Sequence, residues 1–287
     1  MIRVGPAGFA YKDWEGIVYP PDKPKDFDPV RYLAQYFDTI EINSSFYRPP
    51  NPGAARVWAL RVRDNARFRF TAKLYKAFTH ERNASTEDER NFKDGINPLL
   101  EAGRFGALLM QFPWSFRFDR ESRLYVIDLH RRFREYPLVL EVRHASWASP
   151  EALQMLADLD MGIANIDQPL FKKSIKPAAD VTGAVGYVRL HGRNYQNWFS
   201  DKADVRERYD YLYTVRELEP WIDRIRAVGQ RAKDTYAVTN NHNLGKAAVN
   251  ALEITALLRG EHVKAPKSLE ERYPELREFT AEGSESA

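Results

Sequence analysis

Polar side chains that could take part in catalysis close a series of short apolar runs in this sequence. Two glutamates, an aspartate and a histidine among them could exchange protons, because a carboxylate beside another carboxylate or an imidazole acquires a shifted pKa. Lysine and arginine side chains in the same set could stabilise negative charge that develops during a reaction. The set comprises Glu41, Asn43, Lys73, Gln111, Glu141, Arg143, Asp167, Arg189, His191 and Asn241.

Roles can be assigned within this set from residue type. Glu41 and Glu141 are the preferred acid or base, and His191 and Asp167 complete the predicted catalytic residues. A serine nucleophile is not expected, because no serine near a run end lies in a Gly-x-Ser-x-Gly elbow. Substrate-binding residues are predicted at the same run ends and in the loops after them. They are Asn43, Tyr47, Lys73, Gln111, Arg143, Trp147, Arg189, Arg193, Tyr195, Asn240 and Asn241.

The same acidic residues and His191 could in principle bind a metal ion through oxygen and imidazole ligands. The sequence has no His-x-x-x-His or His-x-His pair, and the neighbouring lysine and arginines would repel a cation. We therefore expect no metal and no other cofactor. Other histidines that follow apolar runs, His80, His144 and His242, are kept as further candidates for the site.

The segment after the seventh apolar run favours an anionic ligand. It mixes arginine and asparagine with aromatic rings from Gly192 to Phe199 and continues through Arg206, Arg208, Tyr209, Tyr211 and Tyr213. Such a segment could bind phosphate while its rings stack on a base or sugar. The alternative is a lid that packs on its own aromatic residues. Lys172, Lys173 and Lys176 add a small basic patch, which is typical of a solvated surface.

These residues need a scaffold that brings the run ends together, and the alternation of the chain predicts one. The predicted strands are Ile2 to Ala7, Thr39 to Asn43, Phe68 to Leu74, Phe105 to Phe112, Leu138 to Arg143, Met161 to Asp167, Val185 to His191 and Thr235 to Asn241. Helix candidates between and after them include Pro29 to Phe37, Ala54 to Arg63, Glu121 to Phe133, Pro150 to Leu159, Leu218 to Val228 and Lys246 to Arg259. Ser149 and Gly260 are the expected start and stop signals of two of these helices.

Residue parity within the strands predicts where the polar side chains point. Successive strand residues face opposite sides, so the polar and apolar residues of a run can be separated onto two faces. Glu41 lies opposite the isoleucines of the second strand, and Asn165 and Asp167 lie opposite Ala164 and Ile166 in the sixth. The face packed on helices must be apolar. The polar face is therefore expected to point into a barrel, with its last members at the carboxyl-terminal mouth.

Eight strands separated by helix-length segments favour a single-domain (β/α)8 TIM barrel. An open doubly wound sheet is the alternative, but no Gly-x-Gly-x-x-Gly follows the first strand and no phosphate-binding Gly-x-x-x-x-Gly-Lys-Ser/Thr occurs. We expect the barrel domain to span residues 1–262. Residues 263–287 form a C-terminal extension whose polar end, Glu278 to Ala287, is expected to be frayed.

Composition limits the classes of partner and of chemistry. The 287 residues contain 43 Lys and Arg against 40 Asp and Glu, a formal charge of +3, so long-range attraction to polyanions is mild. Cysteine is absent, which excludes disulfides, thiolate metal sites and cysteine nucleophiles. No stretch approaches the roughly 20 apolar residues that span a bilayer. Met1 leads directly into a strand-like run. We expect a cytoplasmic protein with no membrane partner.

Several motifs together resemble one known family. They are Gly8 to Tyr11, Trp14 to Gly16, Glu41 to Pro49, Phe70 to Lys73, Leu109 to Pro113, Glu141 to His144, Arg189 to Gly192 and Asn240 to His242. In this order they resemble the YecE-like family, also called domain of unknown function seventy-two, over roughly residues 2 to 259. The chain departs from the family pattern at Pro6, Ala7, Phe9 and Thr239. The resemblance implies a TIM barrel and no established reaction.

These observations favour an enzyme that acts on a small anionic, phosphate-bearing substrate by acid–base and electrostatic catalysis, of hydrolase, lyase or isomerase type. Arg143, Arg189 and His191 would stabilise charge in such a site. The alternative function is a non-catalytic barrel that binds nucleic acid or a small anion with the same residues. A third interpretation is that the inward ions neutralise one another as a structural network. Oligomeric state is not specified by any of these patterns.

Overall fold

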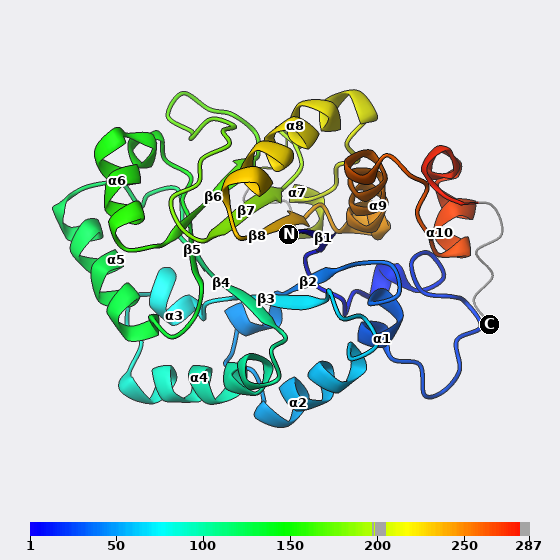
Figure 1. Ribbon diagram of the computed structural model, residues 1–287, viewed down its shortest axis with the longest axis horizontal. Helices are drawn as coiled ribbons and strands as arrows, with labels where there is room; N and C mark the ends of the chain where they lie inside the picture. Colours follow the sequence, from blue (N-terminus) through cyan, green and yellow to red (C-terminus); the bar gives the residue numbers. More distant parts are fainter. Residues whose placement is uncertain (197, 199–204, 282–287) are drawn as a thin grey trace.

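Eight parallel strands form the centre of the computed structural model, which describes residues 1–196, 198 and 205–281 (Figure 1). The strands are β1 Ile2–Pro6, β2 Thr39–Ile42, β3 Arg69–Lys73, β4 Phe105–Gln111, β5 Leu138–Glu141, β6 Gly162–Asp167, β7 Val185–Leu190 and β8 Asp234–Thr239. All eight predicted strands are present, with ends that differ by one or two residues. Their order is β1-β8-β7-β6-β5-β4-β3-β2.

The two edge strands, β1 and β2, meet so that the sheet nearly closes into a barrel. Ala7 and Glu41 form a parallel bridge across this junction, and the Gly8 amide donates to the Glu41 carbonyl at 2.8 Å. Backbone approach is close here, because a Cβ on Gly5 would lie 1.9 Å from the Thr39 carbonyl oxygen. Only glycine fits at position 5. The single-domain TIM-barrel prediction is therefore confirmed, and the open-sheet alternative is not.

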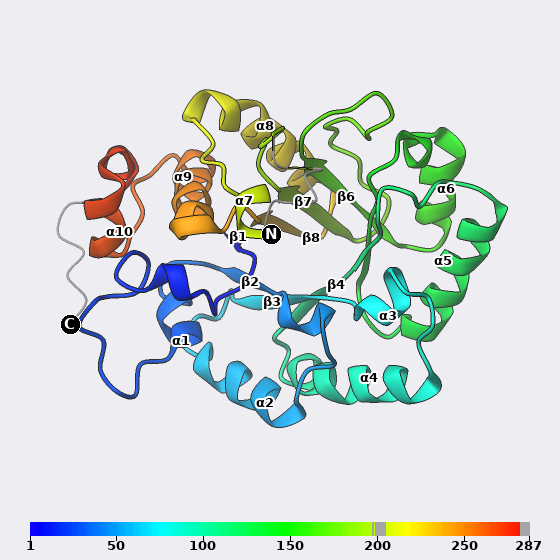
Figure 2. The ribbon, with the colours of Figure 1, turned by 180° about the vertical axis from the view of Figure 1, so that it is seen from behind.

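Helices surround the barrel on its outer side (Figures 1 and 2). Their bounds are α1 Pro29–Leu33, α2 Pro52–Arg61, α3 Lys76–Thr79, α4 Thr86–Glu101, α5 Arg120–Phe133, α6 Pro150–Asp158, α7 Val205–Arg208, α8 Val215–Arg231, α9 Lys246–Arg259 and α10 Lys267–Arg272. Ser149 caps α6 by accepting from the Ala152 amide at 3.2 Å, and Gly260 ends α9 with a left-handed φ of 68°. Both predicted signals are confirmed.

Helix α4 was not among the helix candidates that the sequence pattern named. It contains Gly95 and Pro98, which disfavour helix, and its apolar residues are few. A capping box between Ser85 and Asp88 starts it. Gly95 is needed for packing rather than for helix formation, because a Cβ there would lie 2.2 Å from the Pro50 carbonyl oxygen. Tertiary packing thus stabilises a helix that local propensity underrates.

One crossover of the barrel has no helix. Residues 168–184, between β6 and β7, form a loop that packs on the outer side of β6. Asn165 binds this loop by donating to the Asp180 carbonyl at 2.9 Å and accepting from the Asp180 amide at 2.8 Å. A loop backbone needs hydrogen-bond partners that an apolar helix surface does not need. Two polar residues, Asn165 and Asp167, therefore lie on the outer face of β6.

This loop makes the predicted parity of β6 wrong. In a parallel ladder, residues paired side by side point the same way. The register pairs Ile166 with Arg189 and Asp167 with Leu190, so Ile166 shares the inward face of Arg189. Asp167 and Asn165 consequently face outward, opposite to the prediction. For β2, β3, β4, β5 and β7 the register agrees with the predicted inward face.

The C-terminal extension packs against α9 (Figure 1). It contains α10 and a 3₁₀ turn, Pro274–Phe279, in which Leu269 and Leu276 are fully buried. A bridge between Val263 and Thr280 closes the segment. Residues 282–287 of the tail predicted to be frayed lie outside the described residues. Within the described parts of the chain, no helix is both long and apolar enough to cross a membrane.

Candidate active site

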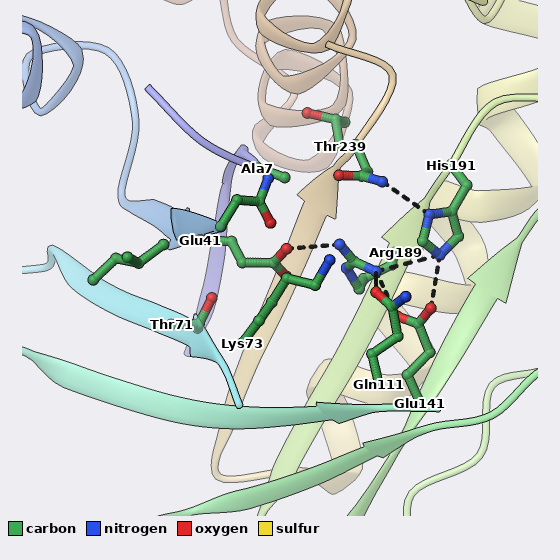
Figure 3. Close-up of polar contacts among 12 residues, drawn as sticks. Ala7, Glu41, Thr71, Lys73, Gln111, Glu141, Arg189, His191 and Thr239 are labelled. Atoms are coloured by element: carbon green, nitrogen blue, oxygen red, sulfur yellow. Dashed lines mark hydrogen bonds and ion pairs between the residues drawn. The ribbon is translucent and has the colours of Figure 1, made fainter. Parts of the chain in front are cut away.

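Arg189 lies at the centre of the barrel mouth, on the inward face of β7 (Figure 3). Its side chain is fully buried between two carboxylates. Nη2 donates to Glu41 Oε1 at 2.6 Å, and Nη1 donates to Glu141 Oε2 at 2.6 Å. Gln111 Oε1 accepts a further bond from Nη1 at 3.1 Å. Residues far apart in sequence are thus held together by one guanidinium group.

The ion pairs decide the protonation states in this cluster. Burial alone would raise the pKa of Glu141, but the charges of Arg189 and Arg143, together with the hydrogen bond from His191, hold that pKa well below its ordinary value. Burial would likewise lower the pKa of Arg189, yet Glu141 and Glu41 raise it above its ordinary value. Glu141 is therefore ionised at neutral pH, and Arg189 stays charged.

Glu41 is bound on its other side by Tyr187, which sequence reasoning missed. The Tyr187 hydroxyl donates to Glu41 Oε2 at 2.9 Å and lies 2.8 Å from Thr71 Oγ1. Burial, followed by the charge of Glu41, raises the pKa of Tyr187 well above its ordinary value. The parity rule contains the missing signal, since Tyr187 precedes Arg189 by two residues and shares its face. Both carboxylate oxygens of Glu41 are thereby occupied.

His191 is neutral and fixed from both ring nitrogens. Its Nδ1 lies 3.1 Å from the side-chain amide nitrogen of Asn240, which can only donate. Nδ1 must then accept, and Nε2 carries the proton that is donated to Glu141 Oε1 at 3.1 Å. Burial is the main reason that the pKa of His191 falls to about 3. The imidazole therefore orients Glu141 and adds no charge to the cluster.

Lys73 differs from the other cations of the mouth. It projects from the end of β3 toward Glu41 and Arg189 (Figure 3) and is partly buried. Its Nζ lies 5.0 Å from the centre of the Phe46 ring, and this nitrogen makes no hydrogen bond or ion pair with any residue that the structure describes. Burial, and then the charge of Arg189, lower the pKa of Lys73 to about 8, against the opposing effect of Glu41 and Glu141.

Arg143 connects this cluster to a cavity of about 210 Å³. Nη1 donates to Gln168 Oε1 at 2.5 Å, Nη2 donates to Glu141 Oε1 at 3.2 Å, and the guanidinium lies 5.3 Å from the Trp198 ring. The cavity walls combine aromatic rings with polar groups. They include His80, Gln111, Pro113, Trp114, Arg143, Gln168, Phe171, Ser174, Trp198, Arg208 and Tyr209.

The formal charges of the cluster do not cancel. Glu41 and Glu141 supply two negative charges, and Lys73, Arg143 and Arg189 supply three positive charges. Since the nearby imidazole is neutral, one positive charge is left in a largely buried site. An ion taken out of water needs a partner, and within this cluster one of the three cations has none.

Comparison with known proteins identifies the family. The family model described as Protein of unknown function DUF72 matches residues 3–274. The chain belongs to the DUF72 family. This match confirms the resemblance to the YecE-like family, which is the same family. A curated relative of this DUF72 protein is the UPF0759 protein YunF of Bacillus subtilis strain 168, with 28% identity over 94% of the chain and 99% of YunF.

Solved structures of DUF72 proteins share the fold. A DUF72 family protein of Thermotoga maritima MSB8 has 33% identity, covers 90% of this chain and 99% of its own, and gives a TM-score of 0.76. A DUF72 family protein of Enterococcus faecalis V583 has 25% identity, covers 90% and 96%, and gives a TM-score of 0.79. Neither name states an activity.

Two predicted site residues of this DUF72 protein lie outside the cluster. Asp167 accepts from Arg193 Nε at 2.8 Å on the outer side of β6, and Arg193 also pairs with Glu217. Asn241 donates to Asn250 Oδ1 of α9 at 2.7 Å. The prediction that Asp167 and Asn241 converge with Glu41 is therefore wrong. They fix the loops after β7 and β8 to the helical layer.

Other predicted residues are distributed between the core and the rim. Trp147 is fully buried and donates from Nε1 to the Phe116 carbonyl at 3.1 Å, so it belongs to the core and not to the cavity, contrary to the prediction. Tyr47 and Tyr195 are exposed, at 63% and 54%. Asn43 donates to the Tyr11 hydroxyl at 3.3 Å.

The loop after β7 supplies part of the cavity wall. Trp198, Arg208 and Tyr209 line the cavity, whereas Asn197, Phe199 and residues 200–204 of the predicted anion-binding segment lie outside the described residues. Gln168 and Trp114 also line the cavity and were not predicted. Both follow a strand end closely, which is a signal that sequence reasoning could have used. Within the described residues, no group of three or more His, Asp and Glu side chains could hold a metal ion.

Proposed function

We propose that this DUF72 protein is an enzyme that acts on a small anionic, phosphate-bearing substrate by acid–base and electrostatic catalysis. The observation that carries the proposal is the surplus positive charge of the mouth, with the Lys73 ammonium unpaired among the described residues and Arg143 on the cavity wall. A phosphate or carboxylate group would supply the missing partner. The aromatic walls would contact the rest of a small molecule.

The protonation states indicate which residue of the site can transfer a proton. A general acid or base works best when its pKa lies near the operating pH, and Lys73 meets this condition with a pKa of about 8. Glu141 is less suited to that task, because its lowered pKa makes it a weak base. We therefore assign proton transfer to Lys73. Glu41 and Glu141, which were the preferred acid or base from sequence, hold Arg189 and polarise the site.

Inorganic phosphate is the simplest probe of the anion site, and its binding can be measured by titration calorimetry. We expect Arg143→Gln to weaken binding about tenfold or more, because a hydrogen bond to a charged group contributes about 1.5–3 kcal/mol. Arg143→Gln leaves Glu141 paired with Arg189, so the fold should survive. Arg131→Gln is the matched control, since Arg131 is exposed on α5 and its one ion pair among the described residues is with Asp128. Equal phosphate affinity in both variants would contradict the anion site.

Catalysis can be separated from binding with Lys73→Met. Phosphorylated sugars and small keto acids would be incubated with the wild-type protein and followed by proton NMR. We expect wild-type protein to convert at least one of them and Lys73→Met to lose conversion by orders of magnitude. Calorimetry should still detect phosphate bound through Arg143, with lower affinity because the positive charge of Lys73 is lost. Conversion that is unchanged in Lys73→Met would refute the assigned proton transfer.

A groove beside the cavity supports the second candidate function, binding of single-stranded nucleic acid. Trp114 and Phe171 line both hollows, and the groove adds Arg117, Lys172 and Lys173, which are exposed cations. Aromatic rings beside cations are typical of such sites. Binding of a short single-stranded oligonucleotide should then weaken steeply with salt, and Lys172→Gln with Lys173→Gln should flatten that dependence. Binding that does not change with salt excludes this candidate.

A further inference from the structure

We infer that Lys73 is a nucleophilic amine that condenses with the carbonyl group of a small anionic aldehyde or ketone to form a Schiff base. This inference rests on the proposed function, narrows its substrate class, and makes Lys73 the attacking amine instead of the group that transfers a proton. The neutral Nζ attacks the carbonyl carbon, a C–N bond forms, and the carbonyl oxygen leaves as water. The two hydrogens of that water are the two that the neutral amine loses, so no oxidant or other reactant is needed.

The pairing pattern around Lys73 separates it from a structural cation. Arg143 and Arg189 each contact Glu141, so both are committed to the ion network. Lys73 stands beside the same carboxylates, but its Nζ forms no hydrogen bond or ion pair with either of them or with any other described residue. A lysine kept only to neutralise a buried carboxylate would be expected to touch one. An amine that has to attack a substrate must instead be free of such a bond.

The surroundings of Lys73 also favour the unprotonated amine. A lysine becomes nucleophilic when it is desolvated or placed near another cation, and Lys73 has both burial and the Arg189 guanidinium. With its pKa near 8, about a tenth of the molecules carry the free amine at pH 7. An ordinary lysine has a pKa of about 10.4, so fewer than roughly one molecule in a thousand carries the free amine at pH 7.

The anionic part of the substrate follows from the same geometry. Arg143 lines the cavity, and its positive charge contributes to lowering the pKa of Lys73. A phosphate or carboxylate bound by Arg143 would hold a neighbouring carbonyl group near Nζ. The site therefore fits 2-oxo acids and phosphorylated aldehydes or ketones of a few carbon atoms. Such a compound, bound as a Schiff base, becomes an electron sink for carbon–carbon cleavage or proton removal, which corresponds to the lyase or isomerase type.

Reductive trapping tests this inference directly. The full-length protein is incubated with pyruvate or with dihydroxyacetone phosphate in the presence of sodium cyanoborohydride, digested, and analysed by peptide mass spectrometry. We expect the peptide containing Lys73 to gain one reduced substrate group at least tenfold faster than the peptides containing Lys172 and Lys173, which are exposed lysines of the same mouth. Inorganic phosphate should slow this reaction, and the pH dependence of the rate should have its midpoint near 8.

The outcomes distinguish the two proposals. If Lys73 is modified no faster than Lys172 with either probe while calorimetry shows phosphate bound through Arg143, the Schiff base is refuted and the anion site stands. If the wild-type protein neither binds phosphate nor modifies Lys73, both proposals fail. Lys73→Arg supplies the background, because it keeps a cation at this position and removes the amine. If Lys73→Arg gains as much reduced substrate group as the wild-type protein does, the inference is also refuted.

Discussion

Arg189 holds together the polar side chains on the inward face of the barrel. It is the shared partner of two fully buried glutamates that lie 100 positions apart in the sequence, and its Nε has no hydrogen-bond partner among the described residues. Buried charges in such a triad cost free energy unless they are paired. The arrangement therefore contributes less to net stability than to holding Glu41, Glu141 and Gln111 in fixed positions around the cavity.

Replacement of Arg189 should be strongly destabilising. Arg189→Met leaves Glu41 and Glu141 buried without their common partner, and we expect the free energy of unfolding to fall by about 3–5 kcal/mol. Urea unfolding measures the loss, with Arg131→Met as the surface control. Combining Arg189→Met with Glu141→Gln should cost less than Arg189→Met alone, since one uncompensated charge is removed. If Arg189→Met lowers the free energy of unfolding by less than about 1 kcal/mol, the two buried glutamates do not need Arg189 to compensate their charge.

Most residues of this site can be predicted from the sequence, and the exceptions have physical causes. Glu41, Lys73, Gln111, Glu141, Arg143, Arg189 and His191 converge as the parity rule predicts. Their roles are not tested by their positions. Asp167 was misplaced because the rule assumed an apolar helix outside every strand, whereas a loop lies outside β6. The difference in protonation between Lys73 and Glu141 depends on contacts that no sequence spacing reveals.

At the scale of elements, α9 is unusual because its buried face includes charge and amide groups. Glu253 is only 4% exposed and accepts from the Asn250 side-chain amide at 2.7 Å. Burial is the main reason that the pKa of Glu253 rises to about 7, with a smaller effect from the charge of Glu275 in the C-terminal extension. The helix that follows the last strand thus carries a titratable group beneath the segment that packs on it.

Glu253 should make stability depend on pH near neutrality. Its pKa is raised from 4.5 to about 7 on folding, so between these values the folded state binds more protons than the unfolded state. The contribution of Glu253 to the free energy of unfolding therefore falls as pH rises through this window. We expect Glu253→Gln to be more stable than the wild type at pH 8 by up to about 3 kcal/mol, with a smaller difference at pH 5. Unfolding in urea at both pH values measures this, and a difference independent of pH would contradict it.

At the scale of the whole molecule, the C-terminal extension completes the outer layer over α9. Tyr273 donates to the Leu244 carbonyl at 2.7 Å, and Leu269 packs near Gly245 in the turn after β8. That turn joins the mouth of the barrel to α9. The predicted boundary between a barrel domain and an extension is not tested by these contacts, but they predict that the barrel depends on the extension.

Removal of residues 263–287 tests this dependence. We expect the shortened chain to unfold at a lower temperature, by several degrees or more, because the apolar surface under Leu269 and Leu276 becomes exposed. Leu276→Ala in the full-length chain should produce part of the same loss, since truncation of a buried leucine costs about 2–5 kcal/mol. Calorimetric unfolding of both proteins provides the measurement. An unchanged melting temperature would mean that residues 1–262 form an independent domain.

The amino-acid sequence by itself determined the eight strands, their alternation with helices in most crossovers, and the inward polar faces of most strands. These features are local, because strand periodicity and helix caps depend on residues a few positions apart. Only the tertiary structure decided the outward face of β6, the burial of Trp147, the hydrogen bond of Tyr187 to Glu41 and the unpaired state of Lys73 among the described residues. Each of these depends on which distant segment packs against the residue, and that is a property of the assembled barrel.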